Sequence, residues 1–196
     1  MNTASTAAQL LRRGRRLEYA TLCWNVVGVL VLAVAAISAG SLALAGFGLD
    51  SAIEISASTV VLWQLAGTGA PGRERRAMRL IGVGFVLLVI YLIAQVVYTV
   101  ATGGRPAPSG PGLVWTALTF LVMLMLAAGK ARTGRALDNP VLTTEGRVTL
   151  IDAYLAASVL LGLALNATLG WWWADPLAGL VIVYYGVREA RKALHH

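Results

Sequence analysis

Charged residues are scarce in this chain of 196 residues. They make up 13% of it, against about 25% of an ordinary soluble domain, whereas 58% of the residues are apolar. So little polar surface cannot cover that much apolar side chain in water. The composition therefore indicates a polytopic membrane protein. It excludes a disordered chain and most cytosolic enzymes.

Cysteine and histidine are almost absent. The single cysteine, Cys23, lies inside an apolar run, which excludes an intramolecular disulfide and a cysteine-rich metal site. The two histidines, His195 and His196, are the last two residues, and whether they are native or belong to a purification tag stays open. Without an intramembrane histidine, a Ser-His-Asp set or a phosphate loop, we expect neither an enzyme nor a prosthetic group.

The apolar residues form six runs that are long enough to cross a membrane as helices, since about 20 residues span the hydrocarbon layer. We expect a single transmembrane domain over residues 1–196, all-α, with a short polar segment at 1–17. The predicted spans are 18–40, 42–66, 79–101, 112–131, 148–170 and 173–192.

The basic residues predict the orientation of these spans. Although the net charge is +7, Lys and Arg gather in short clusters between the apolar runs, so we assign them to topology and expect no nucleic acid partner. The clusters lie before span one, between spans two and three, between spans four and five, and after span six, whereas the opposite loops hold one basic residue, Arg105. By the positive-inside rule both termini are expected in the cytoplasm.

Two carboxylates lie within the second predicted span. Asp50 and Glu54 are four residues apart, which places both on one face of a helix. Because an acidic side chain at membrane depth is costly and usually functional, the pair indicates either a shared proton or a cation held between the two groups. The structural alternative is that both carboxyl groups are protonated and hold helices together by hydrogen bonds.

Span five carries a sparser polar stripe. Asp152 is its one carboxylate, and Glu145 lies two turns earlier on the same face, at the start of the span. Asn166 lies close to that face as well. We take Glu145 as a further candidate ligand; the alternative is that it is a solvated residue beside Arg147. For Asn166 we expect a hydrogen bond to a neighbouring helix.

The predicted depths of the two acidic positions differ. Asp50 lies nine residues from the outer end of span two, or roughly 13 Å, and Asp152 lies 19 residues before Trp171, or roughly 28 Å at 1.5 Å per residue. The two carboxylates therefore meet only if span five tilts strongly or extends well beyond the outer surface of the membrane.

These residues resemble the cation diffusion facilitator family. The stretch Gly46–Glu54 is similar to that family's second transmembrane helix, Thr149–Asp152 to its fifth, and 173–178 to the start of its sixth. The segment Arg73–Ala77, before Leu80–Gly82, is similar to the entry to its third helix. The resemblance covers nearly the whole chain and implies a short form without the C-terminal cytoplasmic domain.

The resemblance implies a divalent metal cation efflux transporter, working as a metal/proton antiporter and as a homodimer in a bacterial cell membrane. It implies that Asp50, Glu54 and Asp152 are metal ligands. The family's fourth ligand precedes Asp152 by one turn, where this chain has Val148. Glu145, a water, Asn25 or Cys23 is left as a candidate for the missing ligand.

Two arguments about the identity of the metal give different answers. The family analogy favours zinc, whereas an all-oxygen set suits manganese, iron, magnesium or cobalt at least as well. A second hypothesis is a membrane protein that keeps this fold without transporting and uses its carboxylates for packing or assembly.

Overall fold

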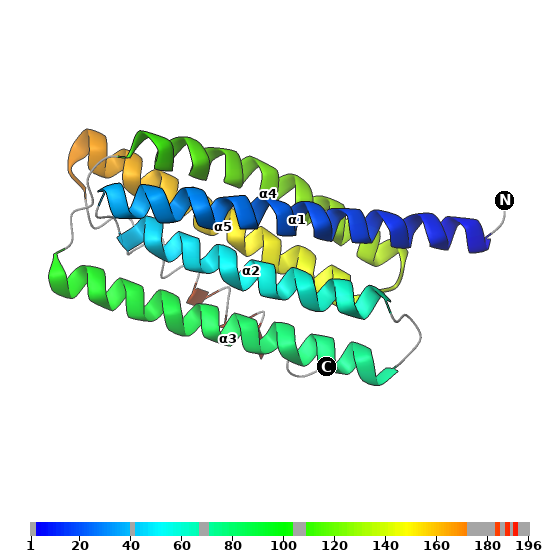
Figure 1. Ribbon diagram of the computed structural model, residues 1–196. Helices are drawn as coiled ribbons and strands as arrows, with labels where there is room; N and C mark the ends of the chain where they lie inside the picture. Colours follow the sequence, from blue (N-terminus) through cyan, green and yellow to red (C-terminus); the bar gives the residue numbers. More distant parts are fainter. Residues whose placement is uncertain are drawn as a thin grey trace.

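The computed structural model describes residues 3–39, 42–66, 71–103, 109–171 and six isolated residues between 183 and 191. Five helices are defined in these residues: α1 (Thr3–Ala39), α2 (Leu42–Ala66), α3 (Pro71–Thr102), α4 (Gly110–Ala136) and α5 (Pro140–Leu169). The helices run up and down the long axis of one bundle (Figure 1). The predicted all-α architecture is confirmed.

The prediction of six spans is wrong for this structure. Among the described residues, five helices are long and apolar enough to cross a membrane, and they are α1 to α5. The predicted span 173–192 falls mostly outside the described residues, as do Arg105, His195 and His196.

Most of the helices are longer than their predicted spans. The bounds of α2 agree with the predicted 42–66, but α1 begins at Thr3, α3 at Pro71 and α5 at Pro140, and α4 continues to Ala136. The apolar pattern marks only the part of a helix that lies in hydrocarbon. Charged turns at the membrane surface can extend the helix beyond that part. The connection between α4 and α5 is consequently reduced to residues 137–139.

Local sequence signals explain where α4 and α5 begin and end. Ser109 caps α4 by accepting a hydrogen bond from the Gly112 amide, and Asn139 caps α5 by accepting one from Leu142 at 2.9 Å. Pro140 follows Asn139 at the first helical position, where a missing N–H costs nothing. Gly170 ends α5 in the left-handed region, with φ of 69°, which glycine adopts without steric cost.

The order of helices in space differs from their order in the chain. The most extensive packing is between the consecutive pairs α4 and α5 and α1 and α2, while α1 also packs on α4 and α2 on α5. Helix α3 lies at the edge of the bundle beside α2 (Figure 1). Gly146 brings α4 and α5 close together, since a Cβ there would lie 2.9 Å from the backbone nitrogen of Ala131.

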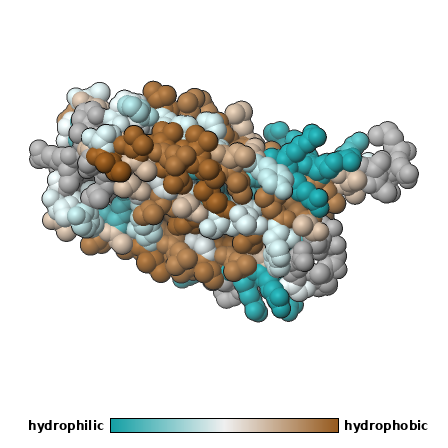
Figure 2. Space-filling view, in the orientation of Figure 1, coloured by the Kyte–Doolittle hydropathy of each residue, from teal (hydrophilic) through white to brown (hydrophobic). Residues whose placement is uncertain are grey.

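The surface of the bundle matches a lipid environment. Large apolar side chains are exposed along the helices, among them Val34, Ile37, Ile90 and Met125, and Ile37 is 85% exposed. Figure 2 shows a hydrophobic band over the middle of the molecule, with hydrophilic residues gathered at the end where α1 starts. The protein is therefore an integral membrane protein, as its composition predicts.

The hydrophilic end of the bundle is where α1, α3 and α5 begin and α2 and α4 end (Figure 1). Exposed arginines such as Arg12, Arg76 and Arg135 belong to these helix ends. Arg15 on α1 donates a hydrogen bond to the Leu65 carbonyl at the end of α2, at 2.9 Å. This bond places a cation at a helix C-terminus, where the backbone dipole favours it.

Candidate functional site

The three carboxylates predicted as ligands lie in the interior of the bundle. Asp50 and Glu54 on α2 and Asp152 on α5 are 3%, 2% and 3% exposed. Their placement follows from the four-residue spacing on α2 and from the packing of α2 against α5. The structure thus brings the acidic face of one helix to the acidic position of the other.

Close helix packing around Asp50 depends on glycine. A Cβ at Gly46 would overlap the Tyr91 hydroxyl and the Gln95 amide of α3. On the other side, a Cβ at Gly28 of α1 would lie 3.5 Å from the Ser51 hydroxyl oxygen. Small residues let neighbouring helices approach in this way, so Gly46 is required for the contact of α2 with α3 at this level.

Asp50 and Asp152 interact with each other across the α2–α5 interface. Both carboxylate oxygens of Asp152 and Oδ2 of Asp50 are buried. When both groups are ionised, these three oxygens have no hydrogen-bond donor among the described residues. Buried polar atoms without partners are rare in proteins and need an explanation. A shared proton or a bound cation would satisfy both groups. The 15 Å difference in depth that the sequence suggests is removed because α5 extends beyond the start of α2 (Figure 1).

Glu145 is not the solvated residue that its position at the start of a span suggested. It lies in the second turn of α5 with 0% exposure. Its Oε1 accepts a hydrogen bond from Lys130 Nζ at 3.2 Å. Glu145 therefore already has a cation as partner, supplied by the adjacent helix α4.

Two members of this buried network, Glu18 and Lys130, are absent from the sequence-based site. Both are 0% exposed, and Lys130 Nζ lies 3.0 Å from Glu18 Oε2. Sequence reasoning assigned Lys130 to a cytoplasmic cluster and left Glu18 at the edge of span one. A signal existed, because both residues adjoin long apolar runs, but their pairing across α1 and α4 requires the tertiary structure.

Thr149 connects the ion pairs to the candidate ligands. Its hydroxyl accepts a hydrogen bond from Lys130 Nζ at 3.0 Å and donates one to Glu54 Oε1 at 2.7 Å. Thr149 is 0% exposed. A continuous polar path thus runs from Glu18 on α1 through Lys130 on α4 and Thr149 on α5 to Glu54 on α2.

The alternatives for a fourth ligand have different surroundings. Val148 is 7% exposed and packs in the apolar core. Asn25 is buried, but its amide nitrogen donates to the Thr21 carbonyl of its own helix. Cys23 is exposed and so does not point into the interior. Asn166, near the end of α5, is half-buried.

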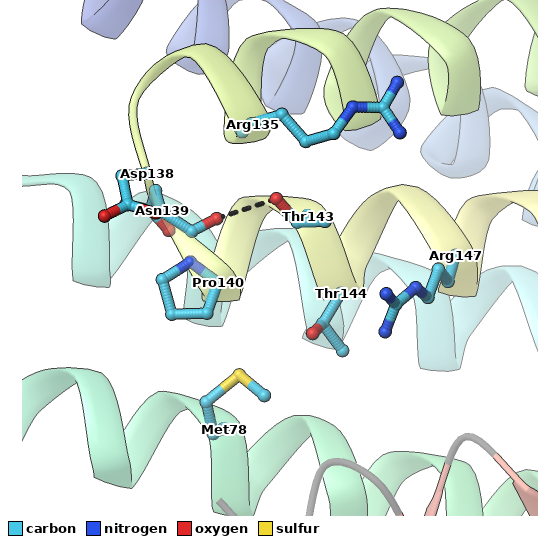
Figure 3. A pocket seen from close by; sticks show the side chains of 9 residues that line it. Met78, Arg135, Asp138, Asn139, Pro140, Thr143, Thr144 and Arg147 are labelled. Carbon is cyan, nitrogen blue, oxygen red and sulfur yellow. Dashed lines mark hydrogen bonds between the residues drawn. The ribbon is translucent and has the colours of Figure 1, made fainter.

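A cavity of about 490 Å³ lies elsewhere, at the basic end of the bundle. Figure 3 shows it between α3 and the α4–α5 connection, with Arg135 and Arg147 on its wall and Asp138 at its edge. None of the buried carboxylates of α2 and α5 lines it. Two arginines oppose the entry of a divalent cation, so this cavity is distinct from the candidate metal site.

Comparison with known proteins gives the family. The model of the cation efflux transmembrane domain matches residues 19–195. The chain belongs to the cation efflux family. The cation efflux family is a family of cation transporters. Transmembrane protein 163 of Xenopus laevis is 28% identical over 180 residues, which cover 84% of this chain. The chain spans about 63% of the length of that relative.

The metal site itself stays a prediction. In the part of the chain that the structure describes, no group of three or more His, Cys, Asp or Glu side chains is assembled closely enough to hold a metal ion. Asp50, Glu54 and Asp152 line one interior, in which Glu54 is engaged by Thr149 and Asp50 faces Asp152. Binding by all three would require them to draw closer together.

Proposed function

We propose that this protein exports divalent metal cations in exchange for protons, by alternating access. The observation that supports this most strongly is the burial of Asp50, Glu54 and Asp152 on facing helices inside a bundle that belongs to the cation efflux family. An uncompensated carboxylate at membrane depth costs at least about 2.5 kcal/mol. A cation or a proton that occupies the site would offset that cost.

The exchange follows from the chemistry of carboxylates. A divalent ion binds their deprotonated form, so protons must leave when the metal arrives. In our proposal the metal enters from the cytoplasm, the bundle rocks to expose the site on the opposite side, and protons from outside replace the metal. Asp50, Glu54 and Asp152 serve as ligands for metal and proton in turn. No prosthetic group is needed.

We place zinc first among the substrates, because the family analogy favours it, and test manganese, iron and cobalt beside it. An oxygen-only set suits the harder ions, so the site itself argues for a broad range. Glu145 is the weakest member of the proposed ligand set, since Lys130 lies 3.2 Å from its Oε1.

The basic end of the bundle supports an orientation. Exposed arginines at the ends of α1, α3 and α4 gather there, and the positive-inside rule then puts this end, including the N-terminus, in the cytoplasm. We propose a bacterial cell membrane as the location and a homodimer as the working form, with contacts inside the membrane.

A second candidate is a protein that keeps the fold without transporting. The hydrogen bond from Thr149 to Glu54 favours it, because it shows that one proposed ligand already has a packing partner. Under this alternative the carboxyl groups hold α2 and α5 together, and Asp50 and Asp152 share a proton.

Metal-driven proton movement in liposomes tests the proposal. Purified protein is reconstituted, a zinc or manganese gradient is imposed, and the internal pH and metal are followed with dyes. Antiport predicts coupled movement of metal and protons, and Asp152→Asn should greatly reduce both. Metal flux without proton counterflow would leave a uniporter. No metal flux in either gradient direction, with any of the four ions, would favour the non-transporting alternative.

A further inference from the structure

Lys130 occupies the centre of the buried network, where its ammonium donates hydrogen bonds to Glu145 and Thr149 and forms an ion pair with Glu18. Its ammonium lies 3.0 Å from Glu18 Oε2, 3.2 Å from Glu145 Oε1 and 3.0 Å from Thr149 Oγ1. All four residues are 0% exposed. An ammonium group has three donors and no acceptor, so this geometry holds the group in one position.

The direction of the hydrogen bonds through Thr149 follows from that arrangement. Since Lys130 can only donate, the Thr149 oxygen must accept from it, and the single hydroxyl proton is left for Glu54 Oε1, 2.7 Å away. The hydroxyl rotor is thereby fixed. Oε1 of Glu54 is thus held in one direction by Thr149.

We infer that Lys130 and Thr149 are positioning residues for Glu54, and that Glu18 and Glu145 hold Lys130 in place for this purpose. The inference rests on the proposed function, since Glu54 is positioned toward a transported cation. It makes α1 and α4, which carry none of the predicted carboxylate ligands, part of the transport site. Glu145 then acts through Lys130 and not as a metal ligand.

A purely structural role for the network predicts a different result. Buried ion pairs can often be replaced by well-packed hydrophobic residues of similar volume without loss of stability, and a structural network would then be dispensable for metal binding. Outer-shell groups that orient a ligand instead affect metal affinity, typically by ten- to a hundredfold when they are removed. The two roles are therefore separated by the metal concentration dependence of transport.

The test compares Thr149→Val with Thr149→Ser in liposomes containing the full chain. Valine keeps the shape of threonine but has no hydroxyl, whereas serine keeps the hydroxyl. Initial zinc and manganese fluxes are measured against metal concentration. We expect Thr149→Val to raise KM about tenfold or more, with a smaller change in maximal flux, and Thr149→Ser to stay near the wild type.

Thr133→Val is the matched control. Thr133 is as buried as Thr149, but its hydroxyl donates to the Gly129 carbonyl of its own helix at 2.8 Å. Its KM should be unchanged. A wild-type KM in Thr149→Val would overturn the inference, as would an equal rise in Thr149→Ser, because the methyl group and not the hydroxyl would then matter.

A second variant tests the part played by Lys130. Lys130→Met combined with Glu18→Gln and Glu145→Gln removes the ion pairs without leaving an unpaired buried charge. We expect this variant to fold and to show a raised KM, because Thr149 loses the donor that orients it. A wild-type KM in the triple variant would overturn the assignment of Lys130. Absence of flux in the wild-type protein would overturn the proposed function and this inference with it, whereas normal wild-type flux with unaffected variants would overturn the inference alone.

Discussion

Replacing Lys130 alone is expected to destabilise the protein more than replacing the whole ion cluster. Lys130→Met removes the buried cation that lies within 3.2 Å of both Glu18 and Glu145. The methionine fills most of the volume of the lysine stem. Its thioether provides no donor, however, so two fully buried carboxyl groups and the Thr149 oxygen lose a partner together.

The size of the effect follows from these contacts. A hydrogen bond to a charged group contributes about 1.5–3 kcal/mol, so the two bonds that Lys130 donates to Glu145 and Thr149 set an upper bound near 6 kcal/mol for hydrogen bonding. Breaking a buried ion pair by removing one partner costs about 3–5 kcal/mol in measured cases, because the remaining groups can take up a proton. We therefore expect a loss of about 4 kcal/mol, which lowers Tm by roughly 10 °C in a chain of this size.

Thermal unfolding of the purified protein in detergent provides the measurement. The control is the triple variant with Glu18→Gln and Glu145→Gln, which should lose less stability than Lys130→Met because neither Glu18 nor Glu145 is left as a buried charge without its cation. A Lys130→Met variant within about 0.5 kcal/mol of the wild type, the usual range for surface substitutions, would contradict the buried ion cluster. So would a triple variant that is less stable than Lys130→Met.

Three further predictions concern packing, metal choice and protons. Gly46→Ala should cost about 1–3 kcal/mol, because the added Cβ overlaps Tyr91 and Gln95, while Gly84→Ala, with no atom within 4 Å of its added Cβ, should be neutral in the same melting assay. Val148→His adds an imidazole one turn before Asp152 and should raise affinity for zinc relative to manganese; unchanged selectivity in a folded variant would mean that position 148 does not face the ion. Metal affinity, measured by titration, should rise with pH because protons compete for the carboxylates, and Glu54→Gln should weaken binding and flatten that dependence; a pH-independent affinity would refute proton competition.

The membrane class, the extent of α2 and the common face of Asp50 and Glu54 could be predicted from the sequence. They depend on properties that repeat along one helix, namely the length of an apolar run and the 3.6-residue period. The same reasoning misjudged the number of spans and the ends of α1, α3, α4 and α5. Apolar length marks hydrocarbon thickness and contains no information about charged turns beyond it.

Contacts between helices were decided by the tertiary structure. The meeting of Asp50 with Asp152 depends on how far α5 is shifted along α2, and the burial of Glu145 depends on the close approach of α4 at Gly146. From the sequence, Lys130 was assigned to a cytoplasmic basic cluster. In the structure it is buried and contacts Glu18 of α1 and Glu145 and Thr149 of α5. A sequence determines which side chains share a helix face, but the axial shift and rotation of one helix against another are set by packing over the whole interface. Those two quantities turned separate charges on four helices into one connected network.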